Sequence, residues 1–287
     1  MYWRCFISCR ENNVQTLRFY KVSPGGNPTI LILDPVSPPL RAGVAGILMS
    51  RDHLQAEQVG YLDLTASPAR LDMMGGEFCG NACRAAAAVM VREGVGMRMV
   101  GREWQGVLSV SGASDPVRLK VTPGPDGSHC AVSMPMPDKS HDFMRECGPG
   151  MGVISLPGIT HLCLDEDRHA FPSDHVRAAE MLRQEHGLTE DAVGCIWYSC
   201  GPSCRIKPVV WVRSTGTTHY ETGCGSGSLA VALWLNRGQN FPTALSVVQP
   251  SGREIAVRMD SALEVWISGP VSVVADGEAY IEEPDLA

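Results

Sequence analysis

Two matched segments constrain what this 287-residue chain can fold into, because each sets a cysteine before a helix that is apolar on every side. Residues 77–82 (EFCGNA) precede the helical stretch 84–93, and residues 222–227 (TGCGSG) precede 228–237. A helix that is apolar all round must be buried. Each helix therefore needs a curled sheet wrapped around it, which predicts two similar units in one chain.

The order of expected elements repeats along the chain. Both halves read as strands, a surface helix, more strands, a Cys-Gly helix and final strands. Cys79 and Cys224 lie 145 residues apart at equivalent points of this order, which indicates an internal repeat. The fold class is therefore α/β (α+β), with two pseudosymmetric domains. We predict an N-terminal extension at 1–16, a domain at 17–137 with the first cysteine, and a domain at 138–274 with the second.

Periodicity and turn residues place the individual elements. Apolar spacing predicts surface helices at 39–55 and 173–186, the second capped by Ser173 and Gly187, and glycines cap the cysteine helices at Gly94 and Gly238. Strands are expected at 17–22, 29–33, 58–64, 69–74, 106–112, 117–122, 129–134, 151–156, 160–164, 194–199, 206–212, 244–249, 253–259, 263–267 and 270–276.

Charge and hydropathy exclude several classes of partner. The net charge is −7 and the chain has no basic run, so neither nucleic acid nor an anionic membrane is an expected partner. No apolar stretch reaches the roughly 18 residues that a membrane-spanning helix needs. The first residues are too short and interrupted for a signal-peptide core, which predicts a cytoplasmic protein.

The chain contains 11 cysteines, and their number and spacing favour free thiols. A reducing compartment keeps thiols reduced, and buried cysteines act as small hydrophobic residues. Cys195, Cys200 and Cys204 are interpreted as structural thiols. The spacings lack the close Cys-x2-Cys pairs of zinc sites, so no metal site is predicted.

The chemistry of the two helix starts points to proton transfer. The first N–H groups of a helix are unpaired and positively polarised, so they bind carboxylates. The same field lowers the pKa of a cysteine placed there. Two such starts facing each other could hold a substrate carboxylate, remove its α-proton with one thiolate and return a proton from the opposite thiol. This reaction requires no cofactor, and none is predicted.

The chain resembles the diaminopimelate epimerase superfamily of cofactor-independent amino-acid racemases, from Leu17 to Glu283. The resemblance implies two domains, each a β-barrel around a central helix, with a last strand at about 275–287 that returns to the first domain. It implies that Cys79 and Cys224 are catalytic, and it allows a homodimer. The residues that it implies in substrate binding are Asn27, Glu57, Gln58, Gly80, Asn81, His161, Gly225 and Ser226.

Departures from the superfamily pattern concern the substrate. The Glu-Arg pair that holds the distal group of diaminopimelate has no counterpart in residues 214–220. Several segments are instead similar to the branch of histidine racemases that serve opine-type metallophores; they are residues 23–27, 57–60, 77–81, 249–252 and 275–280. A carboxylate at Glu57 could then bond an imidazole N–H. We expect Arg84 to form a salt bridge.

Three hypotheses follow. The first is a cofactor-independent racemase that interconverts L- and D-histidine. The second is a diaminopimelate epimerase or another amino-acid racemase. The third is a non-catalytic thiol protein that binds metal or a partner. The acidic residues Glu77 and Glu221 lie close before the two cysteines, where they could tune the thiols or bond turn amides.

Overall fold

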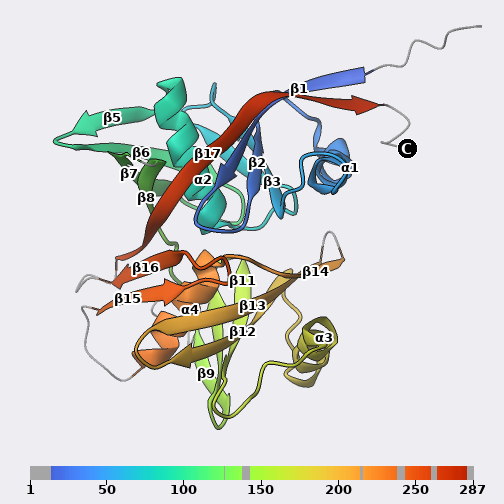
Figure 1. The fold of residues 1–287 in the computed structure, drawn as a ribbon, viewed down its shortest axis with the longest axis vertical. Helices are drawn as coiled ribbons and strands as arrows, with labels where there is room; N and C mark the ends of the chain where they lie inside the picture. Colours follow the sequence, from blue (N-terminus) through green and yellow to red (C-terminus); the bar gives the residue numbers. More distant parts are fainter. Residues whose placement is uncertain are drawn as a thin grey trace, which may run out of the picture.

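The chain is described by a computed structural model that covers residues 14–125, 127–137, 143–213, 216–237, 243–259 and 264–282. Its elements form two groups, one above the other in Figure 1, with the long strand β17 running along both. The upper group, here called the N-terminal half, contains β1 (Val14–Ser23), β2 (Thr29–Ile32), α1 (Pro38–Met49), β3 (Gln58–Asp63), β4 (Arg70–Met73), α2 (Gly80–Glu93), β5 (Met97–Val100), β6 (Glu103–Val110), β7 (Val117–Gly124) and β8 (Gly127–Ser133).

The lower group, here called the C-terminal half, also has strands, a surface helix, strands, a cysteine helix and further strands, with different numbers of strands between them. It contains β9 (Met144–Gly148), β10 (Met151–Leu156), β11 (Ile159–Asp165), α3 (His175–Glu185), β12 (Ala192–Cys200), β13 (Cys204–Val212), β14 (Thr217–Tyr220), α4 (Gly225–Leu235), β15 (Thr243–Val248) and β16 (Glu254–Met259). The last strand is β17 (Val265–Glu282).

Strand pairing confirms the predicted repeat of local order. In the first half α1 connects the parallel strands β2 and β3, β4 returns antiparallel, and β4 then pairs in parallel with β6. In the second half α3 connects the parallel strands β11 and β12, β13 returns antiparallel, and β13 pairs in parallel with β15. The two halves therefore share one topology around their cysteine helices.

β17 joins the two halves. Its first part pairs with β16 on one side and with β8 on the other, and residues 272–282 pair with β1. We expected separate strands at 263–267 and 270–276; the structure has one continuous strand there, because Pro270 lies within the β8 ladder without ending it. Residues 283–287 of the expected final strand lie outside the described part.

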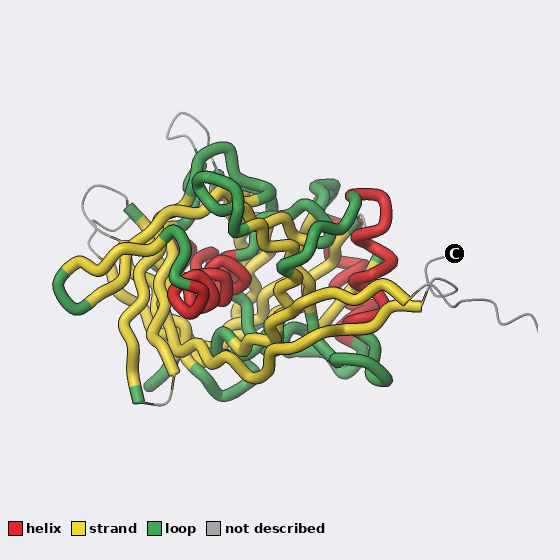
Figure 2. The backbone as a smooth tube through the Cα atoms, turned by 90° about the horizontal axis from the view of Figure 1, so that it is seen from above, coloured by secondary structure: helices red, strands yellow, loops and turns green. Residues whose placement is uncertain are grey.

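Both cysteine helices are buried as predicted. In α2 every residue from Gly80 to Met90 is buried, and α4 is buried from Ser228 to Trp234. Figure 2 shows a helix (red) enclosed by strands (yellow). The large hydrophobic core surrounds both helices, whereas α1 and α3 cover smaller clusters on the outer faces of the sheets. The alanine run of α2 suits this buried place for two reasons. Small side chains let the strands pack close to the helix, and alanine has the highest intrinsic helix propensity.

Element ends differ from the predictions where capping decides them. Both cysteine helices begin directly after their cysteine, several residues before the predicted starts. Helix α3 is capped by Asp174, whose side chain accepts from the Arg177 N–H at 3.2 Å, instead of by Ser173. Gly94 ends α2 with a left-handed backbone (φ 70°), as predicted. Gly238 lies outside the described residues.

Other boundaries moved or were missed. Helix α1 ends at Met49, where the chain turns at Ser50, instead of near residue 55. β1 begins at Val14, inside the expected extension, because its first residues pair with the end of β17. The missed strands are β5, β9 and β14. Each pairs with a single neighbour among the described strands, and such edge strands lack a strong alternating pattern.

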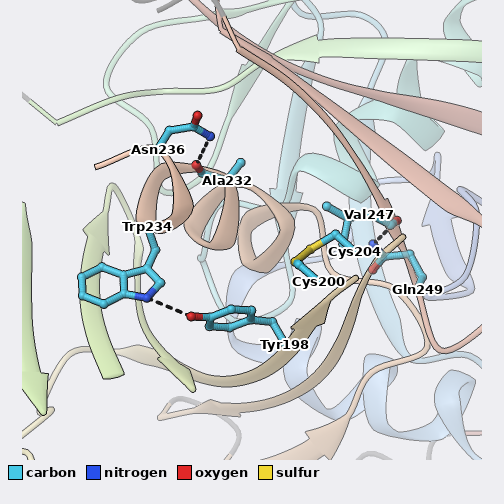
Figure 3. The surroundings of a disulfide bond; sticks show 8 residues. All are labelled: Tyr198, Cys200, Cys204, Ala232, Trp234, Asn236, Val247 and Gln249. Carbon is cyan, nitrogen blue, oxygen red and sulfur yellow. Dashed lines mark hydrogen bonds between the residues drawn. A yellow bond between two sulfur atoms is a disulfide. The ribbon is translucent and has the colours of Figure 1, made fainter. Parts of the chain in front are cut away.

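One expectation about the cysteines was wrong. Cys200 and Cys204, predicted as free thiols, are joined by a disulfide across the β12–β13 turn (Figure 3). The bond lies beside α4, where the Trp234 indole N–H donates to the Tyr198 hydroxyl at 3.1 Å. The other described cysteines, Cys195 among them, are free. In the described part of the chain no helix is long and apolar enough to cross a membrane.

Candidate active site

The two cysteines occupy the same position in the two halves. Cys79 is the N-cap of α2 and Cys224 is the N-cap of α4, with φ and ψ of −131° and 107° at the first and −132° and 107° at the second. Each sulfur accepts a backbone N–H from three residues ahead, Ala82 or Gly227, at 3.4 Å. Both thiols therefore lie at the positive end of a helix.

The two helix starts meet at β17. A Cβ added at Gly80 would lie 2.6 Å from Ile267 Cδ1, and one added at Gly225 would lie 2.5 Å from the same atom. The Asn81 side-chain amide donates to the Gly223 carbonyl at 2.9 Å, which ties the start of α2 to the turn before α4. Segments more than 140 residues apart in sequence thus form one site.

A cavity of about 50 Å³ lies between the helix starts. Water occupies about 30 Å³ in the liquid, so this space is small for an amino acid, and we expect the halves to move apart when a substrate enters. The described residues that line the cavity are Asn27, Gln58, Glu77, Phe78, Cys79, Gly80, Asn81, Ile159, Ala192, Val210, Val212, Glu221, Cys224, Gly225 and Ser226.

Most predicted site residues come together here, and two do not. Glu57 lies beside the cavity, but both its oxygens are taken: Oε1 accepts from the Thr222 hydroxyl at 2.6 Å, and Oε2 accepts from the Thr222 N–H at 3.1 Å and from the Asn27 amide at 3.2 Å. Glu57 therefore connects the two halves, and both its oxygens already accept hydrogen bonds from the protein where imidazole recognition was expected.

His161 lies behind the cavity wall. It is fully buried on β11, two residues beyond Ile159, which does line the cavity, and its ring packs against Gly194. Neither ring nitrogen has a hydrogen-bond partner among the described residues. Burial lowers the pKa of His161 to about 3, which keeps the imidazole neutral.

Burial favours the protonated form of both thiols. Burial raises the pKa of Cys79 to about 12 and holds that of Cys224 well above its ordinary value. The backbone N–H groups at the helix starts lower the pKa of each thiol, as predicted. Burial raises the pKa by more and outweighs this effect. The Cys79 thiol donates to the Gln58 carbonyl oxygen at 3.2 Å. A cation entering the cavity would favour the thiolate.

Two carboxyl groups belong to the site, although the sequence did not single them out as site residues. Glu221 lies beside Cys224 and shares a hydrogen bond with its thiol; Glu77 lies two residues before Cys79. Burial raises the pKa of both carboxyl groups, that of Glu221 to about 8. An acidic residue two or three positions before each cysteine is the sequence signal that could have identified them.

We expect Glu221→Gln to change how stability depends on pH. The pKa of Glu221 is about 8 in the folded chain, against an ordinary 4.5. Between these values the folded state binds more protons than the unfolded state, so the free energy of unfolding falls as pH rises. The variant lacks this pH-dependent loss, so its free energy of unfolding relative to wild type should rise between about pH 4.5 and pH 8. Urea denaturation at several pH values measures it, and a constant difference would contradict the assignment.

Arg84 forms no salt bridge, contrary to our expectation. It is fully buried, and no carboxylate among the described residues contacts it. One guanidinium nitrogen, Nη2, donates to the Pro24 carbonyl at 2.6 Å and to Asn81 Oδ1 at 2.7 Å. This contact orients the Asn81 amide so that its Nδ2 group faces Gly223. Arg84 therefore positions Asn81 and does not reach the cavity itself.

Comparison with known proteins identifies the family of this chain. A family described as "Histidine racemase CntK N-terminal domain" matches residues 16–280. The chain belongs to this histidine racemase family. It is 28% identical over 278 residues to the histidine racemase of Fusobacterium nucleatum subsp. nucleatum, covering 94% of this chain and 99% of that protein. The predicted resemblance is confirmed.

Two further similarities bear on fold and family. The chain is 25% identical to a diaminopimelate epimerase of Xanthomonas euvesicatoria, over 91% of this chain and 96% of that protein. A hydroxyproline epimerase from Agrobacterium vitis has a similar structure, with a TM-score of 0.68, 12% identity and coverage of 95% of each chain. The predicted α/β class is therefore confirmed. Among the described residues, no group of three or more His, Cys, Asp or Glu side chains could hold a metal ion.

Proposed function

We propose that this member of the histidine racemase family interconverts L- and D-histidine by a two-base mechanism. The observation that carries the proposal is the pair of cysteines with the same backbone geometry, at the starts of two buried helices that line one cavity. A base on each side of a substrate carbon is what inversion of that carbon requires. The family and its curated relatives supply the substrate class.

The helix starts bind the substrate carboxylate. Gly80 and Asn81 lie in the first turn of α2, and Gly225 and Ser226 in that of α4, where backbone N–H groups lack helical partners. These groups stabilise the negative charge that builds on the carboxylate when the α-proton leaves, as an oxyanion hole does. Glycine at both positions lets the two helix starts pack against Ile267.

Proton transfer then involves both sulfurs. The substrate ammonium favours the charged form of one thiol, which first gives up its proton to solvent. That thiolate then takes the α-proton and becomes a thiol again. The opposite thiol gives its proton to the other face of the carbon and becomes the thiolate. One proton has entered and one has left, and the cysteines have exchanged roles, so the reverse reaction follows the same path. Closure of the halves excludes water from the exchange.

Proton NMR in D2O tests the proposal directly. The reduced protein is incubated with L-histidine, diaminopimelate, L-methionine and L-proline. We expect the α-proton signal of L-histidine to disappear while chiral chromatography shows D-histidine. Exchange of diaminopimelate in preference to histidine would support the rival epimerase activity. No exchange with any amino acid would contradict a racemase. The homodimer and the cytoplasmic location stay predictions.

A further inference from the structure

The cavity contains two hydrogen-bond acceptors without partners. Asn27 Oδ1 and Glu77 Oε2 are both shielded from solvent and unpaired among the described residues. Asn27 is only 2% exposed and is held by its amide group on Glu57. A buried acceptor is normally paired, so these two atoms point to N–H groups that a ligand brings.

Gln58 and Asn81, two other polar side chains at this site, are already engaged. Gln58 accepts from the Cys79 thiol and donates to the Thr29 hydroxyl at 2.7 Å. Asn81 is held by Arg84 and bonds the Gly223 carbonyl. The α-ammonium group of a substrate can donate to Asn27 Oδ1, and an N–H group on the substrate side chain would pair Glu77 Oε2. Two separate free acceptors therefore suit an amino acid that carries a side-chain N–H group.

The neighbourhood of Glu77 describes that side chain. Ile159, Ala192 and Val212 stand next to one another on β11, β12 and β13 and form an apolar wall. Glu77 lies at its edge, because the next residue, Phe78, packs against the turn at Gly158: a Cβ there would lie 3.3 Å from the Phe78 nitrogen. A flat ring could lie on the wall with an edge N–H directed at the carboxyl group.

The described lining of the cavity offers no cation to a second substrate carboxylate. Glu77 and Glu221 line it, Glu57 adjoins it, and no lysine, arginine or histidine is among the described lining residues. A second substrate carboxylate would face these acids without a cation. The cavity therefore disfavours diaminopimelate, which carries two carboxylates.

We propose that Glu77 is the specificity-determining residue of this site, whose Oε2 accepts the side-chain N–H of a nitrogen heteroaromatic amino acid. The inference rests on the proposed racemase function and adds the residue that selects histidine. It moves this role from Glu57, whose oxygens are occupied by the contact between the halves, to a carboxyl group that lines the cavity.

The test compares Glu77→Met, which removes the acceptor at similar length, with Glu77→Gln, which keeps one oxygen. The control is Glu190→Gln, an exposed carboxyl far along the chain from either motif. Values of kcat/KM for α-proton exchange are measured with L-histidine and L-methionine, and calorimetry gives the Kd of both. Thermal denaturation checks that Glu77→Met and Glu77→Gln remain folded.

We expect Glu77→Met to lose about 10- to 100-fold in kcat/KM for L-histidine, the usual effect of a hydrogen bond to a charged group, with an unchanged value for L-methionine. Glu77→Gln should lose less, and Glu190→Gln nothing. An equal loss for both amino acids would overturn the proposal and assign Glu77 to the α-ammonium. If wild type shows no α-proton exchange but the Kd for histidine still depends on Glu77, only the racemase function is rejected. If there is neither exchange nor Glu77-dependent binding of histidine, the racemase function and the role of Glu77 are both rejected.

Discussion

Replacing Cys79 or Cys224 by alanine is expected to lower histidine racemisation by about 100- to 10,000-fold, the range for a general acid or base. Each sulfur is held by the same capping geometry on its own helix, so neither can take the place of the other. Because inversion needs a base and an acid on opposite faces, loss of either thiol stops the reaction in both directions. Initial rates from L- and from D-histidine measure the effect.

A matched thiol serves as the control for this pair. Cys147 on β9 is a free, partly buried cysteine that does not line the cavity, and its alanine variant should racemise histidine like wild type. The double variant of Cys79 and Cys224 should be no slower than either single variant, since both thiols act in one step. A single variant with wild-type rates from both enantiomers would contradict the two-base mechanism.

Gly26→Ala is expected to lower kcat/KM by about 100-fold through the contact between the halves, because small displacements of reacting groups have effects of this size. Gly26 has φ of 113°, and a Cβ there would lie 2.5 Å from the Thr222 carbonyl oxygen and 2.8 Å from Ser251 Oγ. The added carbon would push Thr222 away and carry the neighbouring Cys224 out of line. Steady-state kinetics measure the loss.

Gly46→Ala is the matched control for this glycine. Gly46 lies inside α1, where an added Cβ meets no atom within 4 Å. This variant should keep wild-type kinetics and gain about 0.8–1.0 kcal/mol in the free energy of unfolding, the difference in helix propensity between glycine and alanine. Wild-type kcat/KM in Gly26→Ala would show that the contact at Thr222 is not needed for catalysis.

Much of the site was predictable because its signals are local. A cysteine followed by glycine before an all-apolar helix defines a capped, buried helix from neighbouring residues alone. The two copies at a fixed separation then predicted the repeat and the facing thiols. The edge strands β5, β9 and β14 were not predictable in this way, because pairing on one side alone leaves little hydrophobic pattern.

The roles of the acidic residues depended on distant contacts. Glu57 was expected to face the substrate, yet Thr222, 165 residues away, occupies its oxygens. Glu77 was left between two interpretations, and its free oxygen became visible only when the residues around the cavity were in place. Arg84 resembled a surface ion-pair residue but is buried against Pro24 and Asn81. Hydrogen-bond partners far apart in sequence leave no periodic signal.

The sequence by itself determined the two buried helices, the cysteines placed shortly before them and the repeat that brings them together, because apolar periodicity and turn residues act between residues a few positions apart. Only the tertiary structure decided the protonation of the thiols and the division of labour among Glu57, Glu77 and Glu221. These properties depend on burial and on partners supplied by both halves. Burial here outweighs the field of the helix start and raises the pKa of Cys79 to about 12.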